Sequence, residues 1–293
     1  MPKQVKHIAS LMECKRVYAH MRPVVLADKK LRKIWCVVEA DEDKKVYKKL
    51  LHSRVHIEVA SIASDAEPYK ETHGCEAVEQ VVADLLAMNE AAYIFGIRDT
   101  DYTRFTTTYQ QSPNVFLTDG RDLEMMLLKS QDVKNAINVL ATRVPDALNK
   151  ACTISREIGY VRIFNDCHPE LGYRVNDIHK CDQLWNQGTK NYCTGWKDYV
   201  WDAYEQQGAY RIAKADVAKF VQQKQLNAKA NEDICQGHDT IGLFIHICNS
   251  GAADFEEQVK KAWYGHYPMA DFLQTSLFGD ILSWANRKEI EVF

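Results

Sequence analysis

Long apolar runs are missing from this sequence of 293 residues. None approaches the roughly 18 consecutive apolar residues that a membrane-spanning helix needs. Residues 1–33 also lack an apolar stretch that ends in a small-residue cleavage site, as an export signal would have. We therefore expect a cytoplasmic protein that does not enter a membrane. The phosphate-binding G-x-x-x-x-G-K-[ST] loop is absent too, so any ATP hydrolysis would have to come from a partner.

Regularly spaced cysteines are missing as well. The nine cysteines are scattered along the chain, and no two of them form a C-x-x-C pair. Zinc sites and disulfide frameworks depend on such spacing, so we expect neither. We interpret the thiols as reduced residues, most of them in the core. Internal repeats and low-complexity tracts are also absent.

The net charge is small, at −3, which argues against a protein that coats nucleic acid. The charge is nevertheless unevenly spread. Residues 1–33 hold nine Lys or Arg against two acids, and residues 211–229 hold five cations against Asp216. Such patches can dock phosphates while an acidic centre elsewhere holds a metal. The alternative is that both segments are solvated helix faces.

The order of the apolar segments predicts an α/β fold. With 46% hydrophobic and 26% charged residues, the chain can bury a large core. Short β-branched runs alternate with segments whose apolar residues recur at helical spacing, which indicates a parallel sheet flanked by helices. The expected strands are 34–38, 55–60, 91–97 and 114–118, and the expected helices are 41–51, 76–88 and 121–130.

The second half of the chain has a different character. After about residue 150 the strand signal weakens, and five of the six tryptophans follow. We expect these tryptophans to pack in a core or interface, or alternatively to stack on bases. The chain therefore divides into a basic N-terminal segment (1–33), an α/β domain (34–150) and a mainly helical, aromatic-rich C-terminal domain (151–293).

Acidic residues follow three of the predicted strands. Glu39 comes after the first, Asp99 and Asp101 after the third, and Asp119 and Glu124 after the fourth. Because the carboxyl ends of parallel strands meet at one edge of a sheet, these side chains are predicted to gather there. Clustered carboxylates repel one another unless a cation lies between them. The pattern therefore favours a metal site.

The D-x-D motif of Asp99 and Asp101 supplies two hard oxygen ligands. If the motif is locally extended, both side chains project to the same side, about 6.5 Å apart along the backbone. Mg²⁺ usually takes only one or two carboxylates and leaves positions for water and phosphate. With Glu39 on a neighbouring strand, the motif predicts a site for Mg²⁺, or for Mn²⁺ as its substitute, that can activate water against a phosphodiester.

Several of these acids have a second interpretation. D-x-D pairs also cap helices or lie in solvated turns, so the motif is weak alone. Asp43, four residues after Glu39, is either a helix N-cap or a residue that orients the metal ligands. Asp119, Asp122 and His238 are further candidates for the orienting role. His238 could also act as a general base, or the His-Asp pair could cap the helix that follows.

Three segments carry a family resemblance: VVEADEDKKVY at 37–47, FGIRDTD at 95–101 and NVFLTDGRDLE at 114–124. Together they resemble the Toprim-like domain of OLD-type nucleases. They are especially similar to the Toprim effectors of PARIS phage-defence systems, which are often encoded beside an ABC-type ATPase. The similarity covers residues 34–130 and extends weakly to residues 237–239.

The resemblance implies a Toprim-like domain at 34–150 with Glu39, Asp99 and Asp101 as catalytic metal ligands and Glu124 as an additional ligand. It implies an endonuclease that cleaves RNA, tRNA included, or DNA, and that acts as a toxin effector in antiviral defence. It also implies an ABC-type or OLD-like ATPase partner and allows a homodimer. Family members usually have glycine after the glutamate, where this chain has Ala40, which is compatible with a negative φ.

Two other functions remain open. A glycosyltransferase, or another metal-dependent transferase, also uses D-x-D to hold a metal, but does not need Glu39 at a strand end. A non-catalytic interaction module would keep a vestigial acidic pocket and dock a partner through its tryptophan-rich half. Binding of a nucleotide sugar would favour the first, and metal binding without cleavage would favour the second.

Overall fold

The computed structural model describes residues 21–27, 33–60, 62–63, 71–72, 74–89, 92–106, 109–168, 181–205, 214–248 and 254–293. By their internal contacts these residues form two compact units. Unit 1 draws on Met1–Asp99, Gln110–Asp119 and Met269–Phe293, and unit 2 on Thr100–Tyr109 and Gly120–Pro268. The predicted basic segment 1–33 lies outside the described residues, apart from 21–27 and 33.

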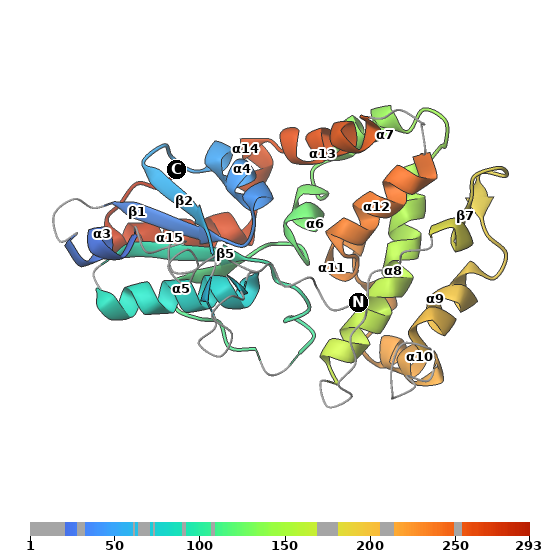
Figure 1. Cartoon of the computed structure of the whole chain (residues 1–293), viewed down its shortest axis with the longest axis horizontal. Coiled ribbons are helices and arrows are strands. Elements are labelled where there is room, and N and C mark those ends of the chain that lie inside the picture. The colour runs from blue at the N-terminus through green and yellow to red at the C-terminus, as the bar shows by residue number, and fades with distance from the viewer. Residues whose placement is uncertain are drawn as a thin grey trace. The chain divides into compact units, whose positions relative to one another are not determined.

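Unit 1 is built on a four-stranded parallel sheet with the order β2-β1-β5-β6 (Figure 1). The strands are β1 (Ile34–Val38), β2 (Val55–Val59), β5 (Tyr93–Arg98) and β6 (Val115–Leu117). Every residue of β1 is buried, as expected for an apolar strand covered on both faces. The predicted α/β fold with a parallel sheet is confirmed, and the predicted strands agree with the observed ones to within about two residues.

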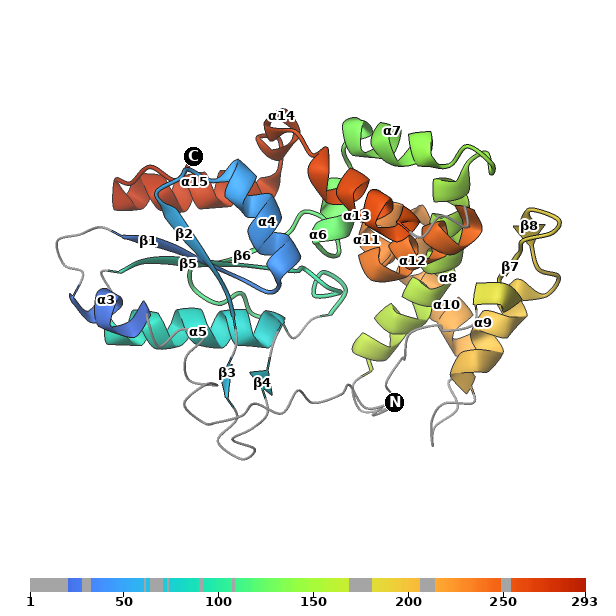
Figure 2. The same ribbon diagram turned by 45° about the horizontal axis from the view of Figure 1, so that its top comes forward.

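Helices cover both faces of this sheet (Figure 2). On one face lie α3 (Met21–Ala27) and α5 (Cys75–Met88), and on the other lie α4 (Asp41–Leu50) and α15 (Ser276–Lys288). A Cβ at Gly96 would come within 2.7 Å of Val78 Cγ1, so the glycine allows α5 to pack close to β5. A short antiparallel pair, β3 (Ile62–Ala63) and β4 (Glu71–Thr72), completes the described strands of the unit.

The C-terminal end of the chain belongs to unit 1. After α14 (Met269–Phe272), helix α15 packs against β6. The buried Trp284 ring lies 4.9 Å from the ring of Phe95 and 6.4 Å from that of Phe116. The compact units thus differ from the division predicted at residue 150, because the end of the chain returns to cover the sheet. Residue 150 itself lies inside helix α8 (Ala147–Asp166).

Unit 2 is mainly helical and is organised around α8 (Ala147–Asp166), which packs along α12 (Gly237–Cys248). The buried Thr240 hydroxyl donates a hydrogen bond of 3.0 Å to Ser155 Oγ between these helices. A small hairpin of β7 (Trp185–Asn186) and β8 (Asn191–Tyr192) precedes α9 (Trp196–Glu205). The remaining elements are α6 (Leu123–Leu127), α7 (Gln131–Leu140), α10 (Lys214–Gln223), α11 (Asn231–Ile234), α13 (Phe255–Gly265) and short 3₁₀ turns at Cys181–Gln183 and Leu226–Ala228.

The helix predicted at 121–130 is shorter in the structure. It ends after Leu127, and Ser130 then caps the separate helix α7 by accepting a hydrogen bond from the backbone N–H of Val133. Across the described ranges, no helix combines the length and the apolar character that crossing a membrane requires.

Candidate functional site

Glu39 and Asp99 lie at the carboxyl ends of the two inner strands of the sheet, Glu39 directly after β1 and Asp99 directly after β5. These strands pair in parallel, with Val37 opposite Gly96. The backbone N–H of Asp99 donates a hydrogen bond of 2.7 Å to Glu39 Oε1. The structure therefore brings together this part of the predicted cluster.

The surroundings of Glu39 favour its negative charge. A Cβ at Gly74 would lie 3.6 Å from Glu39 Oε2, so the N-terminus of α5 is close to the carboxylate. The first N–H groups of a helix carry partial positive charge, which stabilises an anion at this position. Together with the N–H of Asp99, the helix end gives the carboxylate a fixed, polar environment.

The end of β5 is held by a buried arginine that the sequence did not single out. Arg98 Nη1 lies 2.6 Å from Glu79 Oε1 of α5, and Arg98 Nε donates to the carbonyl oxygen of Asp99. Ser112 Oγ donates to Glu79 Oε2 at 3.1 Å. Because Arg98 is only 6% exposed, its charge must be paired, and the pairing fixes the backbone next to Asp99. An arginine directly after an apolar run was the available signal.

Asp43, the third residue of α4, satisfies the backbone N–H of the residue that precedes the helix. Its Oδ2 accepts a hydrogen bond of 2.9 Å from the backbone N–H of Ala40. The N-cap residue Ala40 has a φ of −144°, so alanine in place of the usual glycine causes no strain. The prediction that Asp43 is the N-cap is therefore wrong, because the N-cap is Ala40 and Asp43 is the third residue of the helix. Its role in orienting a metal ligand stays a prediction.

Asp101 does not continue the strand. It has a φ of +47°, in the left-handed region, and its backbone N–H donates to the carbonyl oxygen of Arg121 at 2.6 Å. Its Oδ1 lies 3.3 Å from Arg121 Nη2. The expectation of a locally extended D-x-D is wrong, because a turn begins at Asp101 and Arg121 pairs with its carboxylate. By contacts, Asp99 belongs to unit 1 and Asp101 to unit 2.

Asp119 acts as a cap for the C-terminal helix. Its Oδ1 accepts from the backbone N–H of Ser276 at 2.9 Å, and its Oδ2 accepts from that of Leu277 at 2.8 Å. These N–H groups belong to the first turn of α15, where a helix has no internal acceptors for them. Asp119 thus fixes the helix that covers the sheet.

Asp122 has a comparable structural role in unit 2. Its Oδ1 accepts from the N–H of Met125 at 2.9 Å and its Oδ2 from the N–H of Gly237 at 2.8 Å. Arg121 Nη1 lies 2.7 Å from the same Oδ2. One buried carboxylate therefore caps α6, holds the start of α12 and pairs with an arginine. Its role beside metal ligands stays a prediction.

Glu124 lies in a buried network of unit 2. Its side chain is 9% exposed, and its Oε1 accepts a hydrogen bond of 2.7 Å from the hydroxyl of Tyr264. His238 Nε2 lies 3.6 Å from the same oxygen, and the His238 side chain is 78% exposed. Burial, followed by the negative charge of Asp122, raises the pKa of Glu124 to about 7.

Gly237 makes this network sterically feasible. A Cβ at this position would lie 2.3 Å from Glu124 Cβ and 2.8 Å from Asp122 Oδ1. Only glycine lets the start of α12 lie against both carboxylates. Tyr264, which the sequence did not single out, comes 140 residues after Glu124, so no local pattern could have joined the two.

The donor set suits a hard cation only in part. Within the described residues, no group of three or more His, Cys, Asp or Glu side chains is arranged to hold a metal ion. Mg²⁺ can be held by one or two carboxylates with water in the other positions. Glu39 and Asp99 supply two carboxylates that follow neighbouring strands, and the contact between these residues runs from the Asp99 backbone N–H to Glu39 Oε1.

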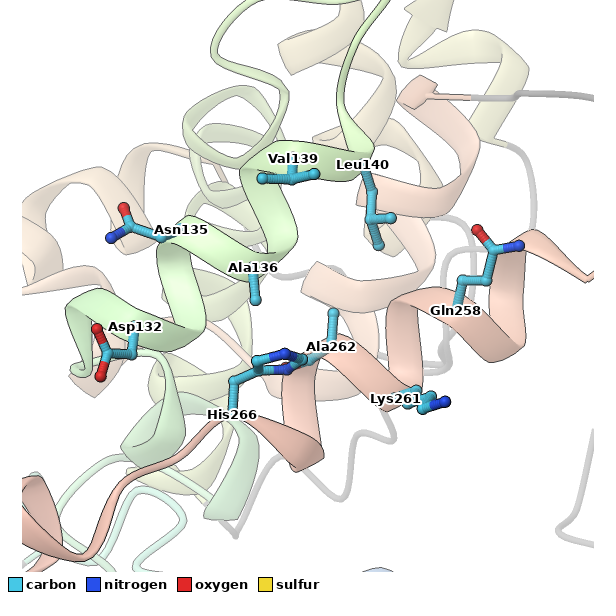
Figure 3. Close-up of a pocket in the computed structure, with 9 residues that line it drawn as sticks. All are labelled: Asp132, Asn135, Ala136, Val139, Leu140, Gln258, Lys261, Ala262 and His266. Carbon is cyan, nitrogen blue, oxygen red and sulfur yellow. The ribbon is translucent and has the colours of Figure 1, made fainter.

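Unit 2 also has an open, mostly apolar groove between α7 and α13, with a volume of about 600 Å³ (Figure 3). Val139, 72% exposed, stands at its edge, and Asp132 and Lys261 supply charges of opposite sign. None of the predicted acidic ligands lines this groove.

Comparisons of this chain with protein-family models, with curated proteins and with solved structures each gave no match.

Proposed function

We propose that this chain is a Mg²⁺-dependent nuclease of the Toprim class. The observation that carries the proposal is the contact between Glu39 and the backbone of Asp99 at the carboxyl ends of adjacent parallel strands. Ligands of α/β sheets bind at such ends. The three sequence segments that resemble OLD-type nucleases supply the choice of nuclease over other functions of such a site.

In this proposal Glu39 and Asp99 hold the metal. Arg98 and its partner Glu79 keep the end of β5 in place, so that the two carboxylates are positioned before the substrate arrives. When bound, Mg²⁺ would polarise the scissile phosphate and activate a water molecule. The carboxylates themselves orient that chemistry and balance the charge of the ion.

The resemblance adds Asp101 and Glu124 as ligands. Asp101 is ion-paired with Arg121, so metal binding through Asp101 requires exchange of that pair. Glu124, with its pKa near 7, must lose its proton to bind a cation. Metal binding through Glu124 is therefore proposed to strengthen as the pH rises through 7.

One observation favours a second function, that of a non-catalytic interaction module. Asp43, Asp119 and Asp122 all accept backbone hydrogen bonds at helix starts, and Asp101 is paired with an arginine. Much of the acidic pattern thus has a structural explanation. In such a module Glu39 and Asp99 would be remnants of a metal site.

Cleavage of labelled RNA and DNA by the purified chain, in Mg²⁺, in Mn²⁺ and in EDTA, tests the proposal. Cleavage that needs the divalent ion supports a nuclease, and sequencing the nucleic acids cut in cells after induced expression identifies the substrate. Calorimetric Mn²⁺ binding without cleavage of either nucleic acid would instead support the interaction module.

The resemblance also leads us to propose control by a partner ATPase. The chain has no phosphate-binding loop of its own. Co-expression with an ABC-type ATPase encoded beside its gene should give one co-eluting complex. Two separate peaks at low salt would contradict this part of the proposal.

A further inference from the structure

The hairpin of β7 and β8, together with the start of α9, has an unusual composition. From Gln183 to Lys197 the chain contains two lysines and no acidic residue. Its amide and hydroxyl side chains include the exposed Asn186, Thr189 and Asn191. A polar segment that carries two lysines and no carboxylate of its own suits contact with an anionic chain.

Three aromatic rings are layered within this segment. Trp185 is buried, and the ring of Tyr192 meets it edge-on with centroids 5.6 Å apart. The ring of Trp196 stacks on Tyr192, with centroids 5.2 Å apart and an angle of 21° between the planes. Tyr192 and Trp196 are only partly buried. The three rings therefore lead from the core of the unit to a partly exposed indole, and the stack itself consists of Tyr192 and Trp196.

The segment is held rigidly, which suits a preformed binding surface. Asn186 Oδ1 accepts hydrogen bonds of 2.9 Å from the backbone N–H groups of Gly188 and Thr189 and so closes the turn. Gln187 donates a hydrogen bond to the carbonyl oxygen of His246 on α12. A preformed surface loses little conformational entropy when it binds a flexible strand.

Cations surround the stack, and nearby carboxylates are paired. Lys197 Nζ lies 5.5 Å from the centre of the Trp196 ring and 2.9 Å from Glu157 Oε1. Asp198 pairs with Lys214 at the start of the basic helix α10. Lys190, at the hairpin turn, is exposed, and its Nζ donates a hydrogen bond of 3.0 Å to Gln187 Oε1. Glu157 and Asp198 are thus paired with lysines, the exposed Asp182 lies 3.5 Å from His246 Nε2, and Lys190 adds positive charge.

We propose that this segment, Trp185–Lys197, is a contact surface for single-stranded nucleic acid, on which a base stacks against Trp196 while Lys190 contacts the backbone phosphates. Stacking on an aromatic ring is tolerant of sequence because every base has a π-face. The inference rests on the proposed nuclease function, since it assigns part of the substrate contact. It goes beyond that function by selecting unpaired strands over duplexes.

Fluorescence anisotropy with labelled 12-nucleotide oligouridylate and oligothymidylate tests the surface on the full chain, in EDTA so that no cleavage occurs. Trp196→Ala should weaken binding roughly 5- to 150-fold, and Trp196→Phe should keep most of it. Lys190→Asn removes the charge, and asparagine tolerates the left-handed φ of +54° at this position. The plot of log binding constant against log salt concentration should become less steep by about 0.7 for this variant.

The matched control is Lys260→Ala, which removes an exposed lysine from α13 of the same unit and should leave binding unchanged. Duplexes of the same length should bind more weakly than the single strands. Equal binding of single strands and duplexes, no binding of either oligonucleotide, or unchanged affinity in folded Trp196→Ala and Lys190→Asn would overturn the inference.

The two proposals fail in different ways. Mg²⁺-dependent cleavage with unchanged strand binding in these variants overturns the contact surface alone. Strand binding that depends on Trp196, without cleavage in any divalent ion, overturns the nuclease alone.

Discussion

The backbone N–H of Asp99 donates a hydrogen bond of 2.7 Å to Glu39 Oε1, across the two inner strands of the parallel sheet. This contact fixes the carboxylate of Glu39 relative to the residue that follows β5. When side chains are already in position before the ligand arrives, less free energy is spent on ordering them during binding. The contact thus gives the proposed metal site its starting geometry.

Glu39→Gln should slow Mg²⁺-dependent cleavage about 100- to 1000-fold, the usual loss for one preorganised stabilising group. Glutamine keeps the Oε1 acceptor for the Asp99 N–H but removes the charge that holds the ion. The melting temperature should change by less than about 2 °C, since packing is retained. Single-turnover cleavage and thermal unfolding of the purified variant measure both quantities.

Glu58→Gln is the matched control for this experiment. Glu58 lies on β2 in the same sheet and pairs with Lys44 on the surface, at 3.2 Å. The same chemical change there should leave the cleavage rate within about twofold of the wild-type rate. A half-exposed ion pair contributes little to stability, so the fold should be retained. If both variants cleave like the wild type, Glu39 is not a metal ligand.

The sheet could be predicted from the sequence because its strands are covered on both faces. Such strands must be apolar throughout, as Ile34–Val38 is, and the helices between them show an apolar stripe. The return of α15 could not be predicted. Trp284 meets Phe95 and Phe116, far away in the chain, and its own helix carries no signal of which partner it covers.

The candidate site was predictable to the same extent. Neighbouring parallel strands bring Glu39 and Asp99 together, as their strand ends indicated. The structural roles of Asp119 and Asp122 were hidden, because the backbone groups they hold at Ser276 and Gly237 come 157 and 115 residues later. A capping carboxylate and a metal ligand look alike when the partner lies that far along the chain.

Gly237→Ala should destabilise the protein by about 1–3 kcal/mol, the range for inserting a methyl group into a packed site. Its Cβ would lie 2.3 Å from Glu124 Cβ, so α12 or α6 must shift. Gly242→Ala is the control in the same helix, since its Cβ would meet nothing within 4 Å apart from the adjoining residues and backbone of its own helix. This change should stabilise the protein by up to about 1 kcal/mol. Urea unfolding of the two variants measures both effects. Unfolding of Gly237→Ala at the same urea concentration as the wild type would contradict the close packing at Gly237.

Glu124→Gln should change how stability depends on pH. The pKa of Glu124 is raised to about 7 in the folded state, so folding favours its protonated form. The contribution of Glu124 to the free energy of unfolding is therefore complete below its unfolded-state pKa near 4.5. It is lost as the pH rises through the folded-state pKa of about 7. The neutral glutamine keeps an acceptor for Tyr264 and avoids this loss.

The free energy of unfolding from urea titrations in EDTA, at pH 4.5, 6 and 7.5, should follow this sign. The free energy of unfolding of Glu124→Gln, relative to that of the wild type, should rise by on the order of 2–3 kcal/mol from the lowest to the highest pH. Parallel stability curves for the two proteins would show that Glu124 titrates normally. EDTA removes any contribution from a bound cation.

Trp284→Ala should cost about 3–5 kcal/mol, the usual loss for removing a large buried aromatic side chain. Trp284 is 2% exposed and packs with Phe95 and Phe116, so its loss opens a cavity between α15 and the sheet. Leu282→Ala, at a position 37% exposed in the same helix, should cost less than about 1 kcal/mol. Hydrogen–deuterium exchange should quicken in the peptide of β6 for Trp284→Ala only. If both variants unfold at the same urea concentration as the wild type, α15 does not cover the sheet in solution.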